Sequence, residues 1–270
     1  MTPMPVPRIL VRSASDVGSA VALRLRQAGH AACLQDDPRP PHPRRGMAFT
    51  DAWFEGAFRL DGVLARLAPS AADLAALLEG GEALPATDAP FAEALAALAP
   101  GIVVDARIHK HAAPSPLRGL ARVTIALGPG FVAGADADFV IETAWGAELG
   151  RVIREGAARA YAGEPRPLDG HGRDRYAYAG AAGLFRTPRA IGEAVRAGDP
   201  VASIGEAAIV APLDGILRGL THDGAEVRAG AKVVEVDPRG DPAAAFGVGE
   251  RPGRIAAGVV AAVAEALRAR

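Results

Sequence analysis

Two stretches near the C-terminal end of the chain repeat each other at a constant offset of 32 residues. Residues 183–204 align with residues 215–236, and the sequence Val-Arg-Ala-Gly occurs at both 195–198 and 227–230. Each copy has apolar runs separated by glycine-containing turns, a pattern that predicts strand, turn and strand. One such hairpin cannot bury its apolar face alone. We therefore expect the two copies to pack together as a small pseudo-symmetric β-barrel.

The repeat resembles the biotinyl/lipoyl-type barrel, also called the barrel-sandwich hybrid. Residues 211–215 correspond to the link between its two halves, and the carriers of this class present a modified lysine just before that link. Residues 206–211 contain no lysine here, and Lys232 stands elsewhere, in the second copy. We therefore expect no biotin or lipoate attachment, and we interpret the barrel as a docking or lid module.

The N-terminal part of the chain alternates strand-like and helix-like patterns. Residues 8–12 and 31–34 are short apolar runs, and the segment between them has helical spacing that stops at Gly29. Further apolar runs at 102–104, 123–127 and 139–141 follow predicted helices at 70–79 and 91–98. Such alternation predicts an α/β fold with a Rossmann-like parallel sheet.

Changes of composition divide the chain into four parts. The Rossmann-like α/β domain covers residues 1–160, and a linker rich in alanine, glycine, proline and charge covers 161–181. The barrel-like β domain covers 182–240. The remaining segment, 241–270, ends in an alanine-rich helix over 255–267 that is too short to stand alone. We expect this helix to pack back on the first domain.

Polar residues and glycines follow the predicted strands of the first domain. In open α/β sheets the ligand lies outside the carboxyl ends of the strands, so these residues should gather at one edge. They are Asp16, Asp36, Asp105, Arg107, Gly128, Gly130 and Glu142. Each of them, taken alone, also fits an ordinary loop-capping group.

The turn after the first strand bears on how a ligand would be held. Ser13 and Ser15 stand where a dinucleotide-binding turn has glycines, which let the backbone approach phosphate. Asp36 follows Asp16 by 20 residues, and an acidic residue at about this distance binds the ribose hydroxyls. Two interpretations stay open: a bound nucleotide, and a Rossmann-like scaffold without a dinucleotide.

A proline-rich stretch at 38–43 is stiff, because each proline fixes φ and restricts the residue before it. It delivers Arg44 and Arg45 to a defined place. Paired arginines there suit an anion or a partner carboxylate. The alternative is a solvated surface pair.

Composition and charge argue against several classes of protein. The chain has 270 residues with 30 Lys+Arg against 31 Asp+Glu, so it lacks the basic bias that binding to nucleic acid needs. The single cysteine, Cys33, allows no disulfide framework and reads as a buried thiol in a strand. His109 and His111 have no third ligand beside them, so we expect no metal. No run has the length of a membrane span or a signal peptide, and we expect a cytoplasmic protein.

Several motifs, taken in order, resemble one family, the selenium-dependent molybdenum hydroxylase system proteins. The family's Arg-Gly-x-Gly-Asp turn reads Arg-Ser-Ala-Ser-Asp at 12–16, and its Pro-x-Pro-x-x-x-Arg-Arg stretch covers 38–45. Val-Asp-Ala-Arg stands at 104–107 with Lys110 after it, Leu-Gly-Pro-Gly-Phe at 127–131, and Val-Ile-Glu-Thr at 140–143. Leu-Gly-Arg-Val-Ile at 149–153 and Asp-Pro-Arg-Gly at 237–240 complete the series.

The chain departs from the family pattern at two places. Both turn glycines are serines, and Ala-Trp-Gly-Ala at 144–147 replaces an Asn-Arg-Gly-His-type segment. The second change removes a basic group and a potential acid–base group from the expected cleft. These departures indicate a divergent subgroup with a different ligand, or a site that has lost part of its chemistry.

The resemblance implies an accessory or maturation protein for a xanthine-dehydrogenase-like molybdenum hydroxylase, with a role in selenium-dependent cofactor modification. It would bind a phosphorylated cofactor or precursor, either the molybdenum cofactor (molybdopterin) or a nucleotide, at the sheet edge. Its partners would be the hydroxylase or cofactor-insertion proteins, and a homo-oligomer is compatible with the sequence. No catalytic residue is assigned. The expected ligand-binding residues are Ser13, Ser15, Asp16, Asp36, Arg44, Arg45, Asp105, Arg107, Lys110, Gly128, Gly130, Glu142, Arg151, Asp237 and Arg239.

Two other functions stay open. An NAD(P)-dependent oxidoreductase is suggested by the opening βαβ pattern and Asp36, but the glycine fingerprint and an obvious proton donor are missing. A non-catalytic docking protein is favoured by the altered segment at 144–147, with the barrel as the docking part and the sheet domain as a relic scaffold.

Overall fold

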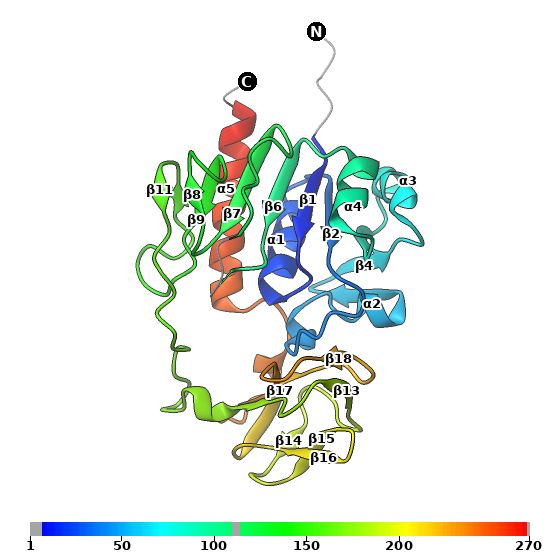
Figure 1. Cartoon of the computed structure of the whole chain (residues 1–270), viewed down its shortest axis with the longest axis vertical. Helices are drawn as coiled ribbons and strands as arrows, with labels where there is room; N and C mark the ends of the chain where they lie inside the picture. The colour runs from blue at the N-terminus through cyan, green and yellow to red at the C-terminus, as the bar shows by residue number, and fades with distance from the viewer. Residues whose placement is uncertain (1–6, 110–113, 269–270) are drawn as a thin grey trace.

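The computed structural model describes residues 7–109 and 114–268 and shows a mixed α/β fold. A nine-stranded sheet flanked by helices forms the larger part, and two four-stranded sheets form a smaller part below it (Figure 1). The large sheet has the strand order β10-β9-β7-β6-β1-β2-β5-β4-β3. Its strands are β1 (Ile9–Arg12), β2 (Ala32–Gln35), β3 (Ala57–Leu60), β4 (Val63–Leu67), β5 (Leu84–Thr87), β6 (Ile102–Asp105), β7 (Val123–Leu127), β9 (Phe139–Ile141) and β10 (Val152–Ile153).

Most neighbouring strands of this sheet run parallel, as predicted. The two edge strands differ: β3 pairs with β4, and β10 pairs with β9, in antiparallel fashion. The sheet is therefore mixed rather than wholly parallel, because a tight hairpin (β3–β4) and a longer loop (142–151) each add an antiparallel strand at an edge. A separate two-stranded sheet joins β8 (Val132–Ala133) to β11 (Gly156–Ala157).

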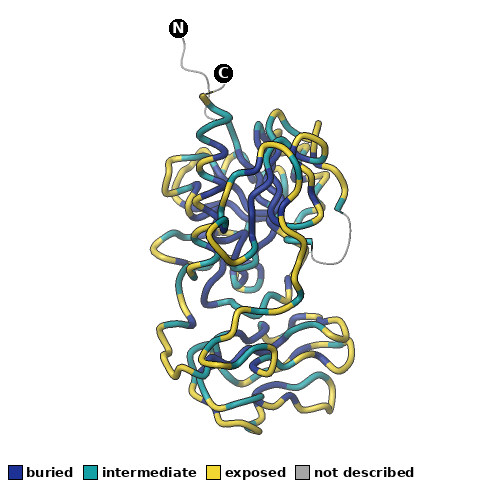
Figure 2. Tube along the Cα trace, turned by 90° about the vertical axis from the view of Figure 1, so that its left-hand side faces the viewer, coloured by how far each residue is buried: buried dark blue, intermediate teal, exposed yellow. Residues whose placement is uncertain are grey.

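Alternate residues of β1 contact different helix layers. Ile9 and Val11 belong to the apolar cluster that contains α1 (Asp16–Gln27) and α5 (Glu250–Arg268), whereas Leu10 packs with α3 (Leu74–Gly80) and α4 (Phe91–Leu98). Burial is concentrated at this sheet (Figure 2). The remaining short helices are α2 (Ala52–Glu55), η1 (Arg45–Met47), η2 (Ala71–Asp73), η3 (Arg173–Arg175) and η4 (Pro242–Ala245).

The thiol of Cys33 is buried in β2, as its apolar neighbours predicted. Burial raises the pKa of this thiol to about 12, so it stays protonated at neutral pH. In the described residues, none of the helices has the length and apolar character needed to cross a membrane.

The smaller part, here called the β module, consists of residues 176–237. One sheet has the order β12-β19-β17-β14 and the other β16-β15-β13-β18. The strands are β12 (Tyr176–Tyr178), β13 (Gly183–Arg186), β14 (Ala194–Val195), β15 (Pro200–Ile204), β16 (Ala207–Val210), β17 (Gly215–Leu220), β18 (Glu226–Val227) and β19 (Lys232–Asp237).

The sequence repeat is reproduced in the strand register. Gly183 pairs with Val227, and Gly215, which lies 32 residues later, pairs with Val195, which lies 32 residues earlier. The pairings of β12 with β19 and of β16 with β15 correspond in the same way, including the bulge in each. The repeat is therefore longer than the sequence comparison indicated, because it begins at β12.

Apolar side chains of both sheets of the β module form one cluster. Phe185 and Val201 of the first copy pack with Leu217 and Val233 of the second. Within residues 7–109 and 114–268, the eight strands of the module form two separate sheets, and no strand pairing closes them into a barrel.

A close approach of backbone at Gly18 gives a test of the β1–α1 packing. A Cβ atom at Gly18 would overlap the carbonyl oxygen of Ser13, whose own φ of 110° lies in the region that favours glycine. We expect Gly18→Ala to lower the free energy of unfolding in urea by about 2–3 kcal/mol. Gly80→Ala is the matched control, since a Cβ there meets open space at an ordinary φ, and its effect should stay within about 1 kcal/mol. Equal effects of the two substitutions would contradict the close approach.

Candidate functional site

The strand order places a topological switch point at β1. The chain continues from β1 to β2 on one side, and β6 pairs with β1 on the other. Ligands of open α/β sheets bind in the crevice outside the carboxyl ends of the strands at this point. Arg12 and Asp105, the last residues of β1 and β6, lie directly opposite each other there.

Arg12, Asp105, Arg107 and His109 form what we call the switch-point cluster. The Asp105 carboxylate is fully buried and accepts hydrogen bonds from Arg107 Nη2 at 2.6 Å and from the Arg107 backbone N at 3.1 Å. Arg12 Nη1 lies 3.5 Å and His109 Nε2 3.6 Å from Asp105 Oδ2. Burial alone would raise the pKa of Asp105, but the hydrogen bonds and charge of Arg107 outweigh it and lower that pKa. The carboxylate is therefore charged at neutral pH.

Two nitrogens of this cluster are buried without a hydrogen-bond partner: Arg12 Nε and His109 Nε2. The Arg12 guanidinium lies 3.7 Å from the centroid of the Phe91 ring, and the His109 ring meets Phe131 edge-on. Ile108, just before His109, has φ 52°, which is strained for a β-branched residue. Unsatisfied donors beside a strained residue are typical of a ligand site.

The turn from β1 to α1 satisfies its own amides. The Ala14 amide donates to Asp36 Oδ2 at 2.5 Å, and the Ser15 amide to Ser13 Oγ at 3.2 Å. The amides of Val17 and Gly18 donate to side-chain oxygens of Asp16 and Ser15. A dinucleotide phosphate would need such amides, so Ser13, Ser15 and Asp36 hold the turn itself in this structure.

Asp36 also contacts His42, with 2.8 Å between Oδ2 and Nε2. Burial would raise the pKa of Asp36, and the hydrogen bond and charge of His42 outweigh it, so this pKa is lowered. Asp36 is the residue expected to bind ribose, and its Oδ2 is thus engaged by the Ala14 amide of the turn and by His42.

Arg44 and Arg45 join the sheet domain to the β module. Arg44 binds both carboxylate oxygens of Glu235 at 2.7 and 3.0 Å and Asp16 Oδ2 at 2.9 Å. Arg45 donates to the carbonyl of Leu220 at 2.7 Å and to Asp51 at 2.7 Å. The interpretation as a solvated surface pair is therefore wrong, because both guanidinium groups are engaged by groups of this chain.

Glu235 is the centre of this contact. It is fully buried in β19, and Arg175 Nε, Lys232 Nζ and Arg218 Nη1 lie 3.4, 3.8 and 3.9 Å from its oxygens, in addition to Arg44. Burial would raise the pKa of Glu235, but the charges of Arg44 and Lys232 outweigh it and lower this pKa to about 2. Glu235 carries little signal in the sequence, where it is a single charge in an apolar strand.

Glu142 and Gly128 shape the loop after β9. The Glu142 carboxylate accepts hydrogen bonds from the backbone amides of Thr143 and Ala144 at 2.8 Å and of Arg159 at 2.9 Å. Gly128 has φ 79°, and a Cβ there would overlap the Thr143 side chain. Gly130 also has a positive φ, 93°.

The other predicted site residues lie apart from the switch point. Arg151 pairs with Glu148 at 2.6 Å on the surface. Asp237 and Arg239, at the end of β19, pair with each other at 2.6 Å. Lys110 and His111 lie outside the described residues. In the described ranges, no group of three or more His, Cys, Asp or Glu side chains is placed to hold a metal ion.

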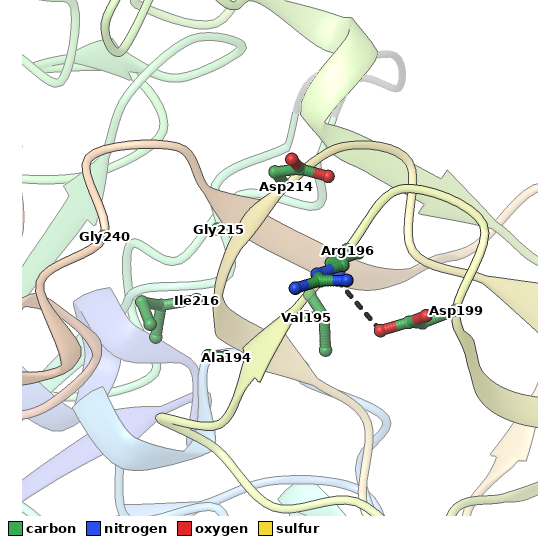
Figure 3. Close-up of a pocket in the computed structure, with 8 residues that line it drawn as sticks. All are labelled: Ala194, Val195, Arg196, Asp199, Asp214, Gly215, Ile216 and Gly240. Atoms are coloured by element: carbon green, nitrogen blue, oxygen red, sulfur yellow. Dashed lines mark hydrogen bonds between the residues drawn. The ribbon is translucent and has the colours of Figure 1, made fainter.

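A shallow pocket in the β module contains none of the predicted site residues (Figure 3). At its rim the Arg196 amide donates to the Asp199 carboxylate at 2.9 Å, and the Asp199 amide donates to the Arg196 carbonyl at 3.0 Å. The pocket lacks the buried unpartnered donors of the switch point, which we therefore take as the candidate site. The lining residues are Ala194, Val195, Arg196, Asp199, Asp214, Gly215, Ile216 and Gly240.

Comparison with known proteins gives one sequence relative and distant structural likenesses. No protein-family model matches the chain. It is 41% identical over 255 residues to the uncharacterized protein YqeB of Escherichia coli, covering 94% of this chain and 47% of YqeB. The chain therefore spans about half the length of the curated relative it matches.

The similar solved structures have low TM-scores. The apo ectoine utilization protein EutE (DoeB) from Ruegeria pomeroyi has a TM-score of 0.25 at 14% identity, covering 85% of each chain. A putative succinylglutamate desuccinylase / aspartoacylase family protein from Shewanella amazonensis has 0.24 at 14%, covering 86% of this chain and 91% of that one. At these TM-scores the likenesses carry no argument about activity.

The buried ion pair at Glu235 predicts a pH-dependent stability. The pKa of Glu235 is lowered from 4.5 to about 2. The ionised carboxylate therefore adds to the free energy of unfolding above pH 4.5, and this contribution is lost as the pH falls toward about 2. We expect Glu235→Gln to lower the free energy of unfolding by about 3 kcal/mol at pH 7. At pH 3 the difference in this free energy between the wild type and the variant should be smaller by about 2 kcal/mol. Urea unfolding at the two pH values measures this.

Glu206→Gln serves as the control, since Glu206 is exposed at the hairpin between β15 and β16. Its effect should be small at both pH values. A gap for Glu235→Gln that stays constant between pH 7 and pH 3 would show that the carboxylate charge is not what stabilises the contact.

Proposed function

We propose that the chain binds a phosphorylated ligand at the switch-point cluster and acts as an accessory protein for a molybdenum hydroxylase. The observation that carries the binding site is the pair of buried nitrogens without hydrogen-bond partners, Arg12 Nε and His109 Nε2. A phosphate oxygen between them would satisfy both and offset the positive charge of Arg12 and Arg107. The half-buried Phe91 ring packs under the Arg12 guanidinium, and the fully buried Phe131 ring supports His109 edge-on, so both aromatic residues hold the proposed phosphate ligands in place.

The ligand we propose is a phosphorylated pterin, the molybdenum cofactor or its precursor, and the partner a xanthine-dehydrogenase-like hydroxylase or a cofactor-insertion protein. This part rests on the motifs that resemble the hydroxylase system family, two of which, at 12–16 and 104–107, supply Arg12, Asp105 and Arg107 of the switch-point cluster. Selenium-dependent modification, a cytoplasmic location and a homo-oligomer belong to the same proposal. YqeB is uncharacterized, so it neither supports nor opposes this assignment.

The NAD(P)-dependent oxidoreductase is the less favoured alternative. Its pyrophosphate would need free amides in the β1–α1 turn, and four of these amides already donate to side-chain oxygens. The proposed ligand instead contacts side chains at the strand ends.

We further propose that the β module is a barrel-sandwich hybrid that docks on the partner protein. The matching registers of its two copies and their shared apolar cluster support this fold. The loop from Gly205 to Glu206 stands where a carrier would present its lysine, so attachment of biotin or lipoate is not part of the proposal.

The test is native mass spectrometry, with elemental analysis, of the protein purified from its own host. We expect a co-purifying mass of molybdopterin size in the wild type and its loss in Arg12→Ala. Arg8→Ala is the matched control, because Arg8 lies just before the opposite end of β1 and pairs with Glu79 at 2.9 Å. This control should keep the bound mass.

Either of two outcomes would contradict the binding proposal. One is a ligand-free mass for the wild-type protein, and the other is equal retention of the ligand by Arg12→Ala and Arg8→Ala. If the ligand-free protein still captures a hydroxylase, the non-catalytic docking function is favoured instead.

A further inference from the structure

Arg251, in the first turn of α5, is a half-buried cation without a carboxylate partner. Its Nε donates to the carbonyl oxygen of Thr143 at 2.8 Å. Across the described parts of the chain, no carboxylate oxygen lies within the 4.0 Å of an ion pair with it, and its two terminal nitrogens make no hydrogen bond. Burial lowers the pKa of Arg251, although not enough to neutralise a guanidinium. Its two terminal nitrogens can therefore donate to an anion.

Asp16 and Glu142 are the two carboxylates whose charges raise the pKa of Arg251, and both are already engaged by other donors. Asp16 accepts a hydrogen bond from Arg44 at 2.9 Å. Glu142 accepts three backbone amides, from Thr143, Ala144 and Arg159. Neither can turn toward Arg251 without giving up these bonds.

Several cations surround these carboxylates. Burial would raise the pKa of Asp16, but the charges of Arg44, Lys232 and Arg251 outweigh it and lower this pKa. Asp16 and Glu235 face Arg44, Lys232 and Arg175, and Arg218 lies 3.7 Å from Asp237 and 3.9 Å from Glu235. Positive charge is therefore in excess where the sheet domain meets the β module, and Arg251 is the member without its own counter-ion.

The charged residues Lys232 and Glu235 of the β module occur in only one copy of the repeat. The offset of 32 residues places Pro200 and Ser203 in the first copy where the second has Lys232 and Glu235. The repeat itself therefore does not require these charges, and they lie on the sheet that Arg44 holds against the large domain. The asymmetry indicates a specific role for this face.

We propose that Arg251 binds a phosphoryl group between the carboxyl edge of the large sheet and the β module. The planar fork of a guanidinium can place its two terminal nitrogens against two phosphate oxygens. The positive end of the 19-residue helix α5 and the neighbouring Arg44 and Lys232 add to the potential there. This site is separate from the switch-point cluster and does not depend on the proposed function.

The experiment is isothermal titration calorimetry of inorganic pyrophosphate into the full chain at low ionic strength. We expect saturable binding that weakens at least tenfold in Arg251→Gln and less in Arg251→Lys. Arg254→Gln is the matched control, because Arg254 lies about one turn further along α5 and contacts carbonyls of the same loop, at Gly146 and Ala147. It should bind as the wild type does. Acetate in place of pyrophosphate tests whether the site selects phosphate over carboxylate.

Three results would overturn the proposal: no saturable binding by the wild type, equal affinities of Arg251→Gln and Arg254→Gln, or acetate binding as tightly as pyrophosphate. Loss of binding in Arg12→Ala, with Arg251→Gln unchanged, would place the anion at the switch point and leave the proposed function standing. If Arg251→Gln does not fold, as judged by circular dichroism, Arg251→Lys decides, since it keeps the charge but loses the fork.

Discussion

The buried contact between Glu235, Arg44 and Asp16 fixes how the two parts of this protein sit together. Glu235 is fully buried in β19, so its charge is tolerable only because Arg44 binds both of its oxygens. The same guanidinium binds Asp16, the first residue of α1, at the carboxyl edge of the large sheet. The rigid stretch at 38–43 holds Arg44 in place, and Arg45 adds a second link to the carbonyl of Leu220. Removing one partner would leave an unpaired buried charge.

This contact also determines the electrostatics of the sheet edge. Lys232 and Arg218 of the β module, and Arg175 just before it, lie 3.4–3.9 Å from the oxygens of Glu235, which Arg44 joins to the sheet edge. Helix α5, which packs on α1, adds Arg251 to the same place. A positive excess results, although the whole chain has a net charge of only −1. Overall neutrality of the chain therefore conceals a local excess of positive charge.

The β module shows how a duplicated sequence can have two different surfaces. The inward-facing residues of both copies, such as Phe185 and Leu217, stay apolar and build one cluster. The registers of β12–β19 and β15–β16 match to the residue, including the bulge in each, whereas the bulge between Leu217 and Gly219 in the β17–β19 pairing has no counterpart between β13 and β15. The outward face of the second copy carries Lys232 and Glu235, where the first has Pro200 and Ser203. Symmetry thus specifies the fold of the module, and departures from symmetry specify its contact with the large domain.

The sequence alone determined the features that depend on local pattern. Apolar periodicity indicated the central strands and helices, and the offset of 32 residues indicated the repeat, because neighbouring residues along the chain set both. It placed Asp105 and Arg107 at a strand end for the same reason. Tertiary structure decided what those groups contact. Ser13, Ser15 and Asp36 satisfy a turn, Arg44 reaches a carboxylate 191 residues away, and Arg251 comes to the edge from the last helix. Such pairings depend on strand order and domain contact, which no local spacing encodes.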